Sequence, residues 1–333
     1  MNKKIFGKLP TGEEIYIYSL TDGDSKAEII TYGARIVSLY PFGDTDVVGG
    51  FDTLDDYITD TSYQGATVGR VANRIADACF EIDGENYTLP KNDNQNCLHG
   101  GIGFSHKVWT VEEYEENRIK LSYHSPDMEN GFPSNLDVTV TYTLTNSTIQ
   151  IDYKAIPDGK TPIALTNHSY FNLDGFGKDY GTHKFQIFAD RYTDVDDNLI
   201  PNGNRPLVDS TPFDLRTLKC IVNETGDFFN YDHNMILSPK TFKSFNGISL
   251  GLVATVENDN IIFNTYTDQP GIQFYTGNFL GYGPNFKNNT PQIPHGAFCL
   301  ETQTEPNCIK KGIGIYDKGE CYTQHTVYEF KKK

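Results

Sequence analysis

One histidine stands inside a run of small, apolar and amide side chains, ALTNHSYFNLDG, at residues 164–175. If this run is extended, alternation puts His168 on one face with Thr166 and Tyr170, away from the aliphatic Ile163 and Leu165. An imidazole in polar and aromatic company is a candidate proton donor or acceptor, because its ordinary pKa lies near neutrality. A structural histidine is the alternative, so the rest of the chain must supply partners for chemistry.

A carboxylate that fits this role lies in GAFCLETQTEPN, residues 296–307. Alternation in an extended chain puts Cys299, Glu301 and Gln303 on one face, and Phe298 and Leu300 on the other. A carboxylate and an amide beside an apolar face indicate a site. An ordinary solvated strand has the same pattern, so Glu301 alone does not decide between the two.

A second histidine, His99, precedes Gly100 and Gly101 in NCLHGGIGFSHKVW, residues 96–109. Glycines let the backbone turn sharply and let a ligand approach it closely. The stretch does not match GxGxxG in a βαβ setting, so a dinucleotide site is not expected. Taken alone, it is better explained as a mobile glycine loop with an incidental histidine.

Two further stretches carry polar side chains. Gln273 and Tyr275 share a face in QFYTGNFL, and Asp232, His233 and Asn234 are expected in a loop within FFNYDHNMIL. An Asp-His-Asn triplet can bind a metal, but the chain has no HExxH, no facial-triad spacing and no thiolate pair, so no metal is expected. The chain also lacks a GxSxG motif, which argues against a serine triad.

The elements that must position these residues are strands, because the dominant hydrophobic period is two. LDVTVTYTLT and STIQIDYKA meet at Asn-Ser, which predicts a hairpin, and Asp83-Gly84 predicts another because that turn type needs positive φ. FDTLDDYI predicts one short helical turn. We therefore expect a single all-β domain over residues 1–333, a large antiparallel β-sandwich of two packed sheets.

Composition limits the possible partners. The 333-residue chain carries a formal net charge of −16, which disfavours nucleic acid and anionic membranes as partners because both would repel it. No apolar run is long enough for a signal peptide or a membrane span. The 6 cysteines show no paired spacing, which favours reduced thiols and a cytoplasmic protein.

Taken in order, these stretches resemble the aldose 1-epimerases, also called galactose mutarotases. The motifs that carry the resemblance are GRVANRI, LHGG, NHSYFNL, DNLIPNG, FDLR, YDHN, YTGNFL and ETQTEPN, within roughly residues 30–307. The resemblance implies a β-sandwich with an open, concave sugar site. It also implies interconversion of the α and β anomers of galactose, glucose or both, with no cofactor and no metal. We expect a monomer or weak dimer that acts alone.

The resemblance also implies roles for individual residues. Glu301 matches the general base and His168 the general acid, while His99 matches a residue that contacts the sugar and assists catalysis. Three further residues match groups that hold sugar hydroxyls: Arg70, Asp232 and Gln273. We expect neighbouring carboxylates to favour the protonated form of His168, and we expect Glu301 not to be held in a strong salt bridge.

Two other functions remain open at this point. A carbohydrate-binding module on the same sandwich would need groups that contact hydroxyls, but it would not need Glu301 paired with His168. An epimerase of phosphorylated hexoses would need basic residues for the phosphate. No basic cluster lies near the stretches described above, so the phosphate-specific enzyme ranks last.

Overall fold

Four antiparallel strands at the N-terminal end of the chain form the first sheet in the computed structural model, which describes residues 2–333. The strand order follows the sequence: β1 (Asn2–Lys8), β2 (Glu14–Asp22), β3 (Ser25–Ile30) and β4 (Arg35–Tyr40). Apolar side chains alternate along β2 and β3, so one face of the sheet is buried against the rest of the molecule.

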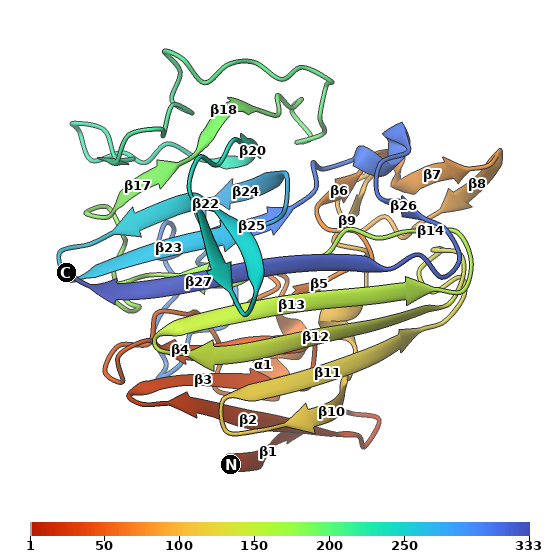
Figure 1. The fold of residues 1–333 in the computed structure, drawn as a ribbon, viewed down its shortest axis with the longest axis horizontal. Coiled ribbons are helices and arrows are strands. Elements are labelled where there is room, and N and C mark those ends of the chain that lie inside the picture. Colours follow the sequence, from red (N-terminus) through yellow and green to blue (C-terminus); the bar gives the residue numbers. More distant parts are fainter. Residues whose placement is uncertain (1) are drawn as a thin grey trace.

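The largest sheet has ten strands and crosses the whole molecule (Figure 1). All of its paired strands are antiparallel. Its order is β10 (Thr110–Tyr114), β11 (Arg118–Ser125), β12 (Leu136–Thr145), β13 (Thr148–Pro157), β27 (Tyr322–Lys332), β23 (Ile261–Thr267), β22 (Ile248–Glu257), β17 (Lys184–Ile187) and β19 (Lys219–Cys220), and β21 (Phe242–Phe245) also pairs with β22.

A five-stranded antiparallel sheet carries most of the residues of interest. Its order is β16 (Tyr170–Phe171), β25 (Phe298–Gln303), β24 (Gly271–Tyr275), β20 (Asp232–Leu237) and β18 (Ala189–Tyr192). Every residue of β24 and β25 is buried, so both faces of these central strands are covered. The expectation that Asp232, His233 and Asn234 lie in a loop is wrong, because they form the first half of β20.

Short elements complete the structure. They are the helix α1 (Leu54–Thr59), the 3-10 turns η1 (Ala76–Ala78), η2 (Phe104–His106) and η3 (Cys308–Lys311), and the strands β5 (Thr67–Val68), β6 (Arg74–Ile75), β7 (Cys79–Ile82), β8 (Glu85–Thr88), β9 (Cys97–Leu98), β14 (Thr161–Pro162), β15 (Thr166–Asn167) and β26 (Ile315–Tyr316). Helix α1 begins within FDTLDDYI and ends one residue after it, at Thr59, and Thr53 caps it by accepting from the Asp56 N–H. This confirms the predicted helical turn.

The sheets pack around one large apolar cluster that draws side chains from all three. Phe298 and Leu300 point from β25 into this cluster, where the rings of Phe298 and Phe185 lie 5.0 Å apart. The Tyr328 hydroxyl of the large sheet donates to the Leu300 carbonyl at 3.1 Å. The predicted β-sandwich is therefore confirmed, and its apolar layer fixes which face of β25 is left for a site.

The two hairpins expected from turn sequences are also present. Asp83 and Gly84 have φ of 52° and 86° between β7 and β8. Asn146 and Ser147 have φ of 46° and 59° between β12 and β13. In both turns the residues adopt the positive φ that a tight antiparallel hairpin needs.

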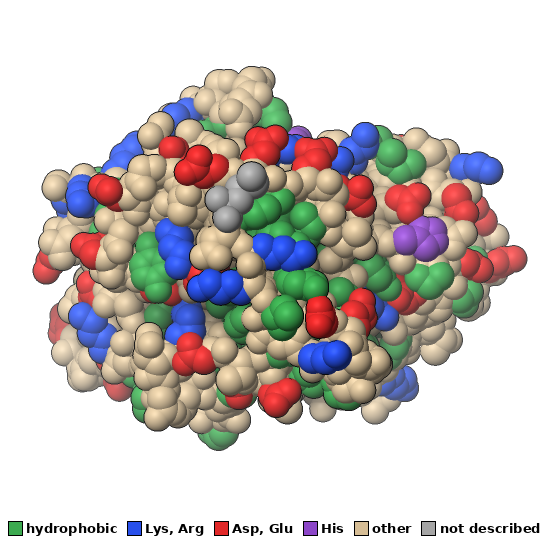
Figure 2. All heavy atoms as spheres, turned by 90° about the horizontal axis from the view of Figure 1, so that it is seen from below, with side chains coloured by type: hydrophobic (Ala, Val, Ile, Leu, Met, Phe, Trp, Pro, Cys, Tyr) green, Lys and Arg blue, Asp and Glu red, His purple; other side chains and the backbone are tan. Residues whose placement is uncertain are grey.

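Charged groups of both signs are interspersed on the face seen in Figure 2, and neither sign forms a continuous patch there. No helix among residues 2–333 is long and apolar enough to cross a membrane. All six cysteines are unpaired.

Candidate active site

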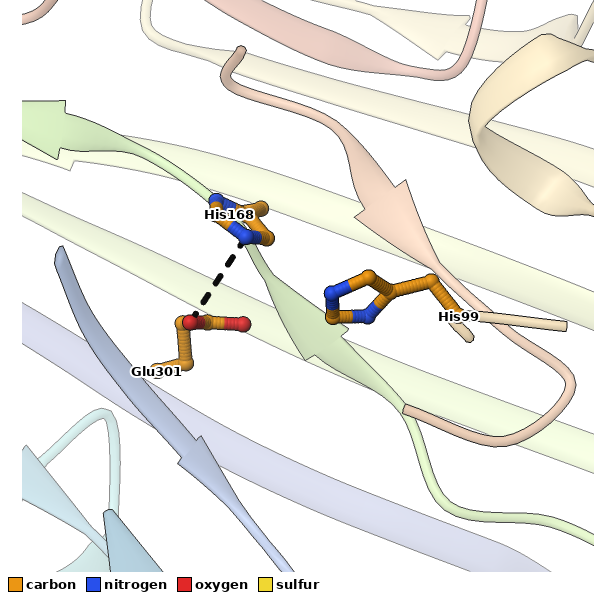
Figure 3. Close-up of side chains that lie close together, drawn as sticks. All are labelled: His99, His168 and Glu301. Carbon is orange, nitrogen blue, oxygen red and sulfur yellow. Dashed lines mark ion pairs between the residues drawn. The ribbon is translucent and has the colours of Figure 1, made fainter. Parts of the chain in front are cut away.

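The imidazole of His168 and the carboxyl of Glu301 face each other in a cavity beside the five-stranded sheet (Figure 3). Glu301 Oε1 lies 3.7 Å from His168 Nε2, and both side chains are buried. Because Phe298 and Leu300 occupy the core face of β25, alternation directs Glu301 to the opposite face. The His168 backbone is held by the Ala66 carbonyl and the Gly65 N–H, each at 2.9 Å.

Aromatic rings pack around the His168 imidazole. The Tyr170 ring stacks at a centroid distance of 5.1 Å, and the Tyr63 ring stacks at 5.9 Å. His99 meets the same imidazole edge-on at 5.2 Å. The ring therefore has little freedom to rotate, so Nε2 stays directed toward Glu301.

His99 reaches the cavity from the glycine loop that follows β9. Its φ is 54°, and a Cβ on the neighbouring Gly100 would lie only 2.3 Å from the Gly69 carbonyl oxygen, so this turn requires glycine. The Asn73 N–H donates to His99 Nδ1 at 3.1 Å. A neutral imidazole that accepts at Nδ1 carries its proton on Nε2. His99 is therefore an N–H donor toward the cavity.

Asp232 also lines the cavity, where it accepts from Gln273 Nε2 at 2.7 Å. Arg74 Nη1 lies 3.8 Å from Asp232, and Arg74 Nε donates to Asp93 at 2.7 Å. Gln273 Oε1 and Glu301 Oε2 are buried oxygens without a hydrogen-bond partner among the described residues. Unpaired buried acceptors are costly, so these two are suited to a ligand that brings hydroxyl donors.

The cavity has a volume of about 180 Å³ and combines these polar groups with apolar walls. Its lining residues are Thr61, Ser62, Tyr63, Asn73, Arg74, Leu98, His99, His168, Tyr170, Asp232, Tyr275, Phe279, Leu280 and Glu301. Four of the six candidate site residues from the sequence therefore line the cavity: His99, His168, Asp232 and Glu301. Gln273 is not a lining residue, but it donates a hydrogen bond to Asp232, which lines the cavity.

Arg70 lies elsewhere, and this corrects the expectation that it faces the same cavity. Its guanidinium donates to Ser125 Oγ at 2.8 Å, to the carbonyls of Pro126 and Pro133 at 3.0 and 2.8 Å, and to Thr161 Oγ1 at 3.1 Å. With these partners and 2% exposure, the side chain has no donor left for a ligand. The arginine that lines the cavity is Arg74, four residues later in GRVANRI.

Sequence reasoning also missed Tyr63, Asn73 and Leu280, which line the cavity. Asn73 and Arg74 stand inside GRVANRI, so the motif does mark the cavity, but through its second arginine rather than its first. Two aromatic residues of QFYTGNFL, Tyr275 and Phe279, also line the cavity. Trp109 does not, because it is buried in the apolar core against Phe104.

Burial controls the protonation of the central pair. It raises the pKa of Glu301 well above its ordinary value, and the nearby charge of Asp232 adds to the increase. Burial also lowers the pKa of His168 to about 3, with a further contribution from the positive charge of Arg35. The expectation that nearby carboxylates keep His168 protonated is therefore wrong, because burial has the larger effect. Both groups prefer their neutral forms.

Among residues 2–333, one group of three side chains has donor atoms close enough for a metal ion: those of His99, His168 and Glu301 lie within 4.8 Å of one another. To ligate through Nε2, His99 would have to move its proton to Nδ1, which faces the Asn73 N–H at 3.1 Å. Two donors would then oppose each other. The hydrogen-bond pattern thus favours proton transfer over metal binding at this cluster.

The chain matches the family model described as aldose 1-epimerase over residues 16–329. It is 39% identical to the galactose mutarotase of Rattus norvegicus, with 99% of this chain and 98% of the relative covered. It is 35% identical to the aldose 1-epimerase of Haemophilus influenzae, with 97% of each covered. Among solved structures, an aldose epimerase homologue from C. elegans superimposes with a TM-score of 0.86 at 26% identity, covering 95% of this chain and 98% of the other.

Proposed function

Because the chain belongs to the aldose 1-epimerase family, we propose that it interconverts the α and β anomers of galactose, glucose or both. The observation that carries this proposal is the buried pair of Glu301 and His168, with Oε1 and Nε2 3.7 Å apart in an open cavity. The name of the rat relative supports galactose as one substrate.

Ring opening of a hexopyranose needs one base and one acid. The base takes the proton of the anomeric hydroxyl O1, a carbonyl forms at C1, and the C1–O5 bond breaks as the acid protonates O5. Rotation about the C1–C2 bond presents the other carbonyl face, and closure reverses the transfers. We assign Glu301 as the base at O1 and His168 as the acid at O5.

The neutral forms of Glu301 and His168 are compatible with this assignment. A protonated Glu301 with a neutral His168 holds as many protons as a carboxylate with an imidazolium. A proton shift within the pair therefore generates the reactive form without a proton from solvent. Sugar hydroxyls that donate to Glu301 favour its carboxylate form, because hydrogen bonds to a charged group stabilise that charge.

The remaining cavity residues are proposed to orient the sugar. His99 donates from Nε2, Asp232 accepts, and Arg74 presents guanidinium donors, so that together they match hydroxyls that both donate and accept. Arg74, rather than Arg70, is thus the arginine assigned to bind sugar hydroxyls. Gln273 holds the Asp232 carboxylate at 2.7 Å and presents its free Oε1 on the Glu301 side of the sheet.

The two rival functions lack equivalent support. A sugar-binding module would not require a buried carboxyl opposed to a buried imidazole, because it transfers no proton. A hexose-phosphate epimerase would require free cations, whereas the only Lys or Arg among the described cavity-lining residues is Arg74, whose guanidinium lies beside Asp93 and Asp232. The cytoplasmic location, expected from composition, and the monomer or weak dimer, expected with the family resemblance, both stay predictions.

The decisive experiment is polarimetry. Protein is added to freshly dissolved α-D-galactose and, separately, α-D-glucose, and the approach to anomeric equilibrium is compared with that of E301Q. We expect rapid equilibration that is lost in E301Q and unaffected by EDTA. Sugar binding without any acceleration by the wild-type protein would instead favour the binding module.

A further inference from the structure

One carboxylate organises the segment 60–66, which follows helix α1. Asp60 is buried and accepts from the backbone N–H groups of Ser62 at 2.8 Å and Gln64 at 3.1 Å. Arg35 Nη1 lies 3.8 Å from the same carboxylate and donates to the Gln64 carbonyl at 2.8 Å. Because breaking a buried ion pair leaves an uncompensated charge, this turn has little freedom to open.

The far end of the segment is bonded to the backbone of His168. The Gly65 N–H donates to the His168 carbonyl, and the Ala66 carbonyl accepts from the His168 N–H, each at 2.9 Å. Gly65 has a φ of 67°, and a Cβ there would lie 2.0 Å from the Ile36 carbonyl oxygen, so this close approach requires glycine. The segment therefore joins a rigid turn to the backbone of the proposed acid.

Tyr63 lies in the middle of the segment with a φ of 59°, a left-handed conformation that bulky side chains rarely adopt. Its ring centroid lies 4.6 Å from that of His99 and 5.9 Å from that of His168. The two imidazoles, which Figure 3 shows side by side, are 5.2 Å apart. Both imidazoles are buried and Tyr63 is half-buried, so its ring covers them on a side that reaches solvent.

We propose that Tyr63 is a positioning residue whose ring holds the imidazoles of His168 and His99 in place. This inference rests on the proposed acid role of His168. A left-handed tyrosine costs free energy, and such a conformation persists where the surrounding structure imposes it. Here the turn at Asp60 and the bonds to the His168 backbone impose it, and the ring lies against the two histidines of the cavity.

Hydrogen bonds alone do not fix the His168 ring. Cys299 Sγ lies 3.7 Å from Nδ1 and Glu301 Oε1 lies 3.7 Å from Nε2, and both distances exceed that of an ordinary N–H···O bond. The orientation of the ring therefore depends on packing, which Tyr170 supplies from β16 and Tyr63 from the segment. Orientation matters because a misplacement of about 1 Å can lower the rate of an enzyme about 10²-fold.

The hydroxyl of Tyr63 has a competing role that must be separated from that of the ring. It accepts from Asn92 Nδ2 at 3.3 Å, and its own proton remains available for a sugar. Tyr63→Phe removes the hydroxyl and keeps the ring, whereas Tyr63→Gly removes both. Glycine is the suitable replacement because it adopts positive φ without strain, so the turn keeps its conformation.

The kinetic test is polarimetry of Y63F and Y63G with α-D-galactose. We expect Y63F to keep the wild-type kcat and KM. In Y63G we expect kcat to fall about ten- to a hundredfold, with KM changed by about threefold at most, because the residues that orient the sugar remain. The matched control F242A removes an exposed aromatic ring on β21 outside the cavity and should change neither constant.

The structural test is NMR of protein labelled at its histidine and tyrosine rings, with signals assigned by their loss in H168Q, H99Q and Y63F. In the wild-type protein the Tyr63 ring protons should show nuclear Overhauser contacts with both imidazoles. In Y63G the ring signals of His168 and His99 should shift and broaden, while those of His325 on the large sheet stay unchanged. Thermal melting should place Y63G within about 5 °C of the wild-type midpoint.

Several results would overturn the inference. Missing contacts between Tyr63 and the imidazoles in the wild-type protein would do so without any variant. A wild-type kcat in Y63G would show that the ring is not needed, and a loss in Y63F equal to that in Y63G would assign the effect to the hydroxyl. A wild-type protein that does not accelerate mutarotation would overturn the proposed function instead, and the NMR contacts would still decide whether Tyr63 holds the two rings.

Discussion

The imidazole of His168 is the side chain whose removal separates catalysis from binding most cleanly. In His168→Gln we expect kcat to fall about 10²–10⁴-fold, the typical contribution of one positioned proton transfer. KM should change little, because His99, Asp232 and Arg74 still line the cavity. Polarimetry measures the rate and calorimetric titration measures sugar binding.

A matched control for this variant is His124→Gln, which alters an exposed histidine paired with Asp137 on the large sheet. Its activity should equal that of the wild-type protein. A near wild-type rate in His168→Gln would remove His168 from the role of acid and leave His99 as the remaining imidazole of the cavity.

The carboxyl of Glu301 carries a stability cost that depends on pH. Its folded-state pKa is raised above the ordinary value, so ionisation is harder in the folded than in the unfolded protein. The folded state loses stability as pH rises from the unfolded pKa toward the folded pKa, by about 1.4 kcal/mol per unit of separation once both are passed. Glu301→Gln has no such charge to bury.

We therefore expect Glu301→Gln to be inactive yet more stable than the wild-type protein at pH 8, with the difference vanishing below about pH 4, where both states are protonated. Thermal melts at several pH values measure this. A difference that is constant with pH would show that the carboxyl is not destabilised by burial, and would point to a packing effect of the amide.

At the scale of strands and loops, GRVANRI positions two arginines for different tasks. Arg70 joins the end of β11, the following loop and β14 through Ser125, Pro126, Pro133 and Thr161. Arg74 begins β6 and reaches the cavity instead. The first arginine therefore holds loops together, whereas the second lines the cavity while it pairs with Asp93 and Asp232.

The pair of variants Arg70→Met and Arg74→Met tests this division. Arg70→Met should lower the free energy of unfolding by about 3 kcal/mol or more, because each buried acceptor left unpaired costs roughly 1–3 kcal/mol. Arg74→Met should leave the thermal midpoint nearly unchanged and raise KM about ten- to a hundredfold through the loss of a charged hydrogen bond. The reverse pattern would return Arg70 to the site.

Local signals in the sequence predicted much of this architecture, because hairpin turns and strand alternation depend on neighbouring residues. Asp83-Gly84 gave a hairpin, and the alternation around Glu301 separated its face from that of Leu300. The segment around His168 was not predictable in the same way. It passes through three two-residue strands, β14, β15 and β16, whose partners β26, β5 and β25 lie far away in the chain. Tertiary packing determines which strands pair over such distances in the chain, and the hydrophobic period of the sequence carries no information about it.

At the scale of the whole molecule, charge selects against anionic substrates. The net charge of −16 repels a sugar phosphate, and cavity-lining Arg74 already lies beside Asp93 and Asp232. A phosphate at C6 would need a free donor cluster that the described lining residues do not supply. We expect kcat/KM for α-D-glucose 6-phosphate to be at least about tenfold below that for α-D-glucose, which is the effect of about 1.4 kcal/mol.

Ionic strength separates long-range repulsion from a missing phosphate site. The screening length falls from about 10 Å at 0.1 M salt to about 3 Å at 1 M, so added salt should recover part of the deficit for the phosphorylated sugar. It should leave the neutral sugar unaffected. If the deficit came only from repulsion by the net charge, 1 M salt would abolish it. A residual deficit at high salt identifies the cavity itself as the discriminating element, whereas faster turnover of the phosphate at every salt concentration would revive the hexose-phosphate epimerase.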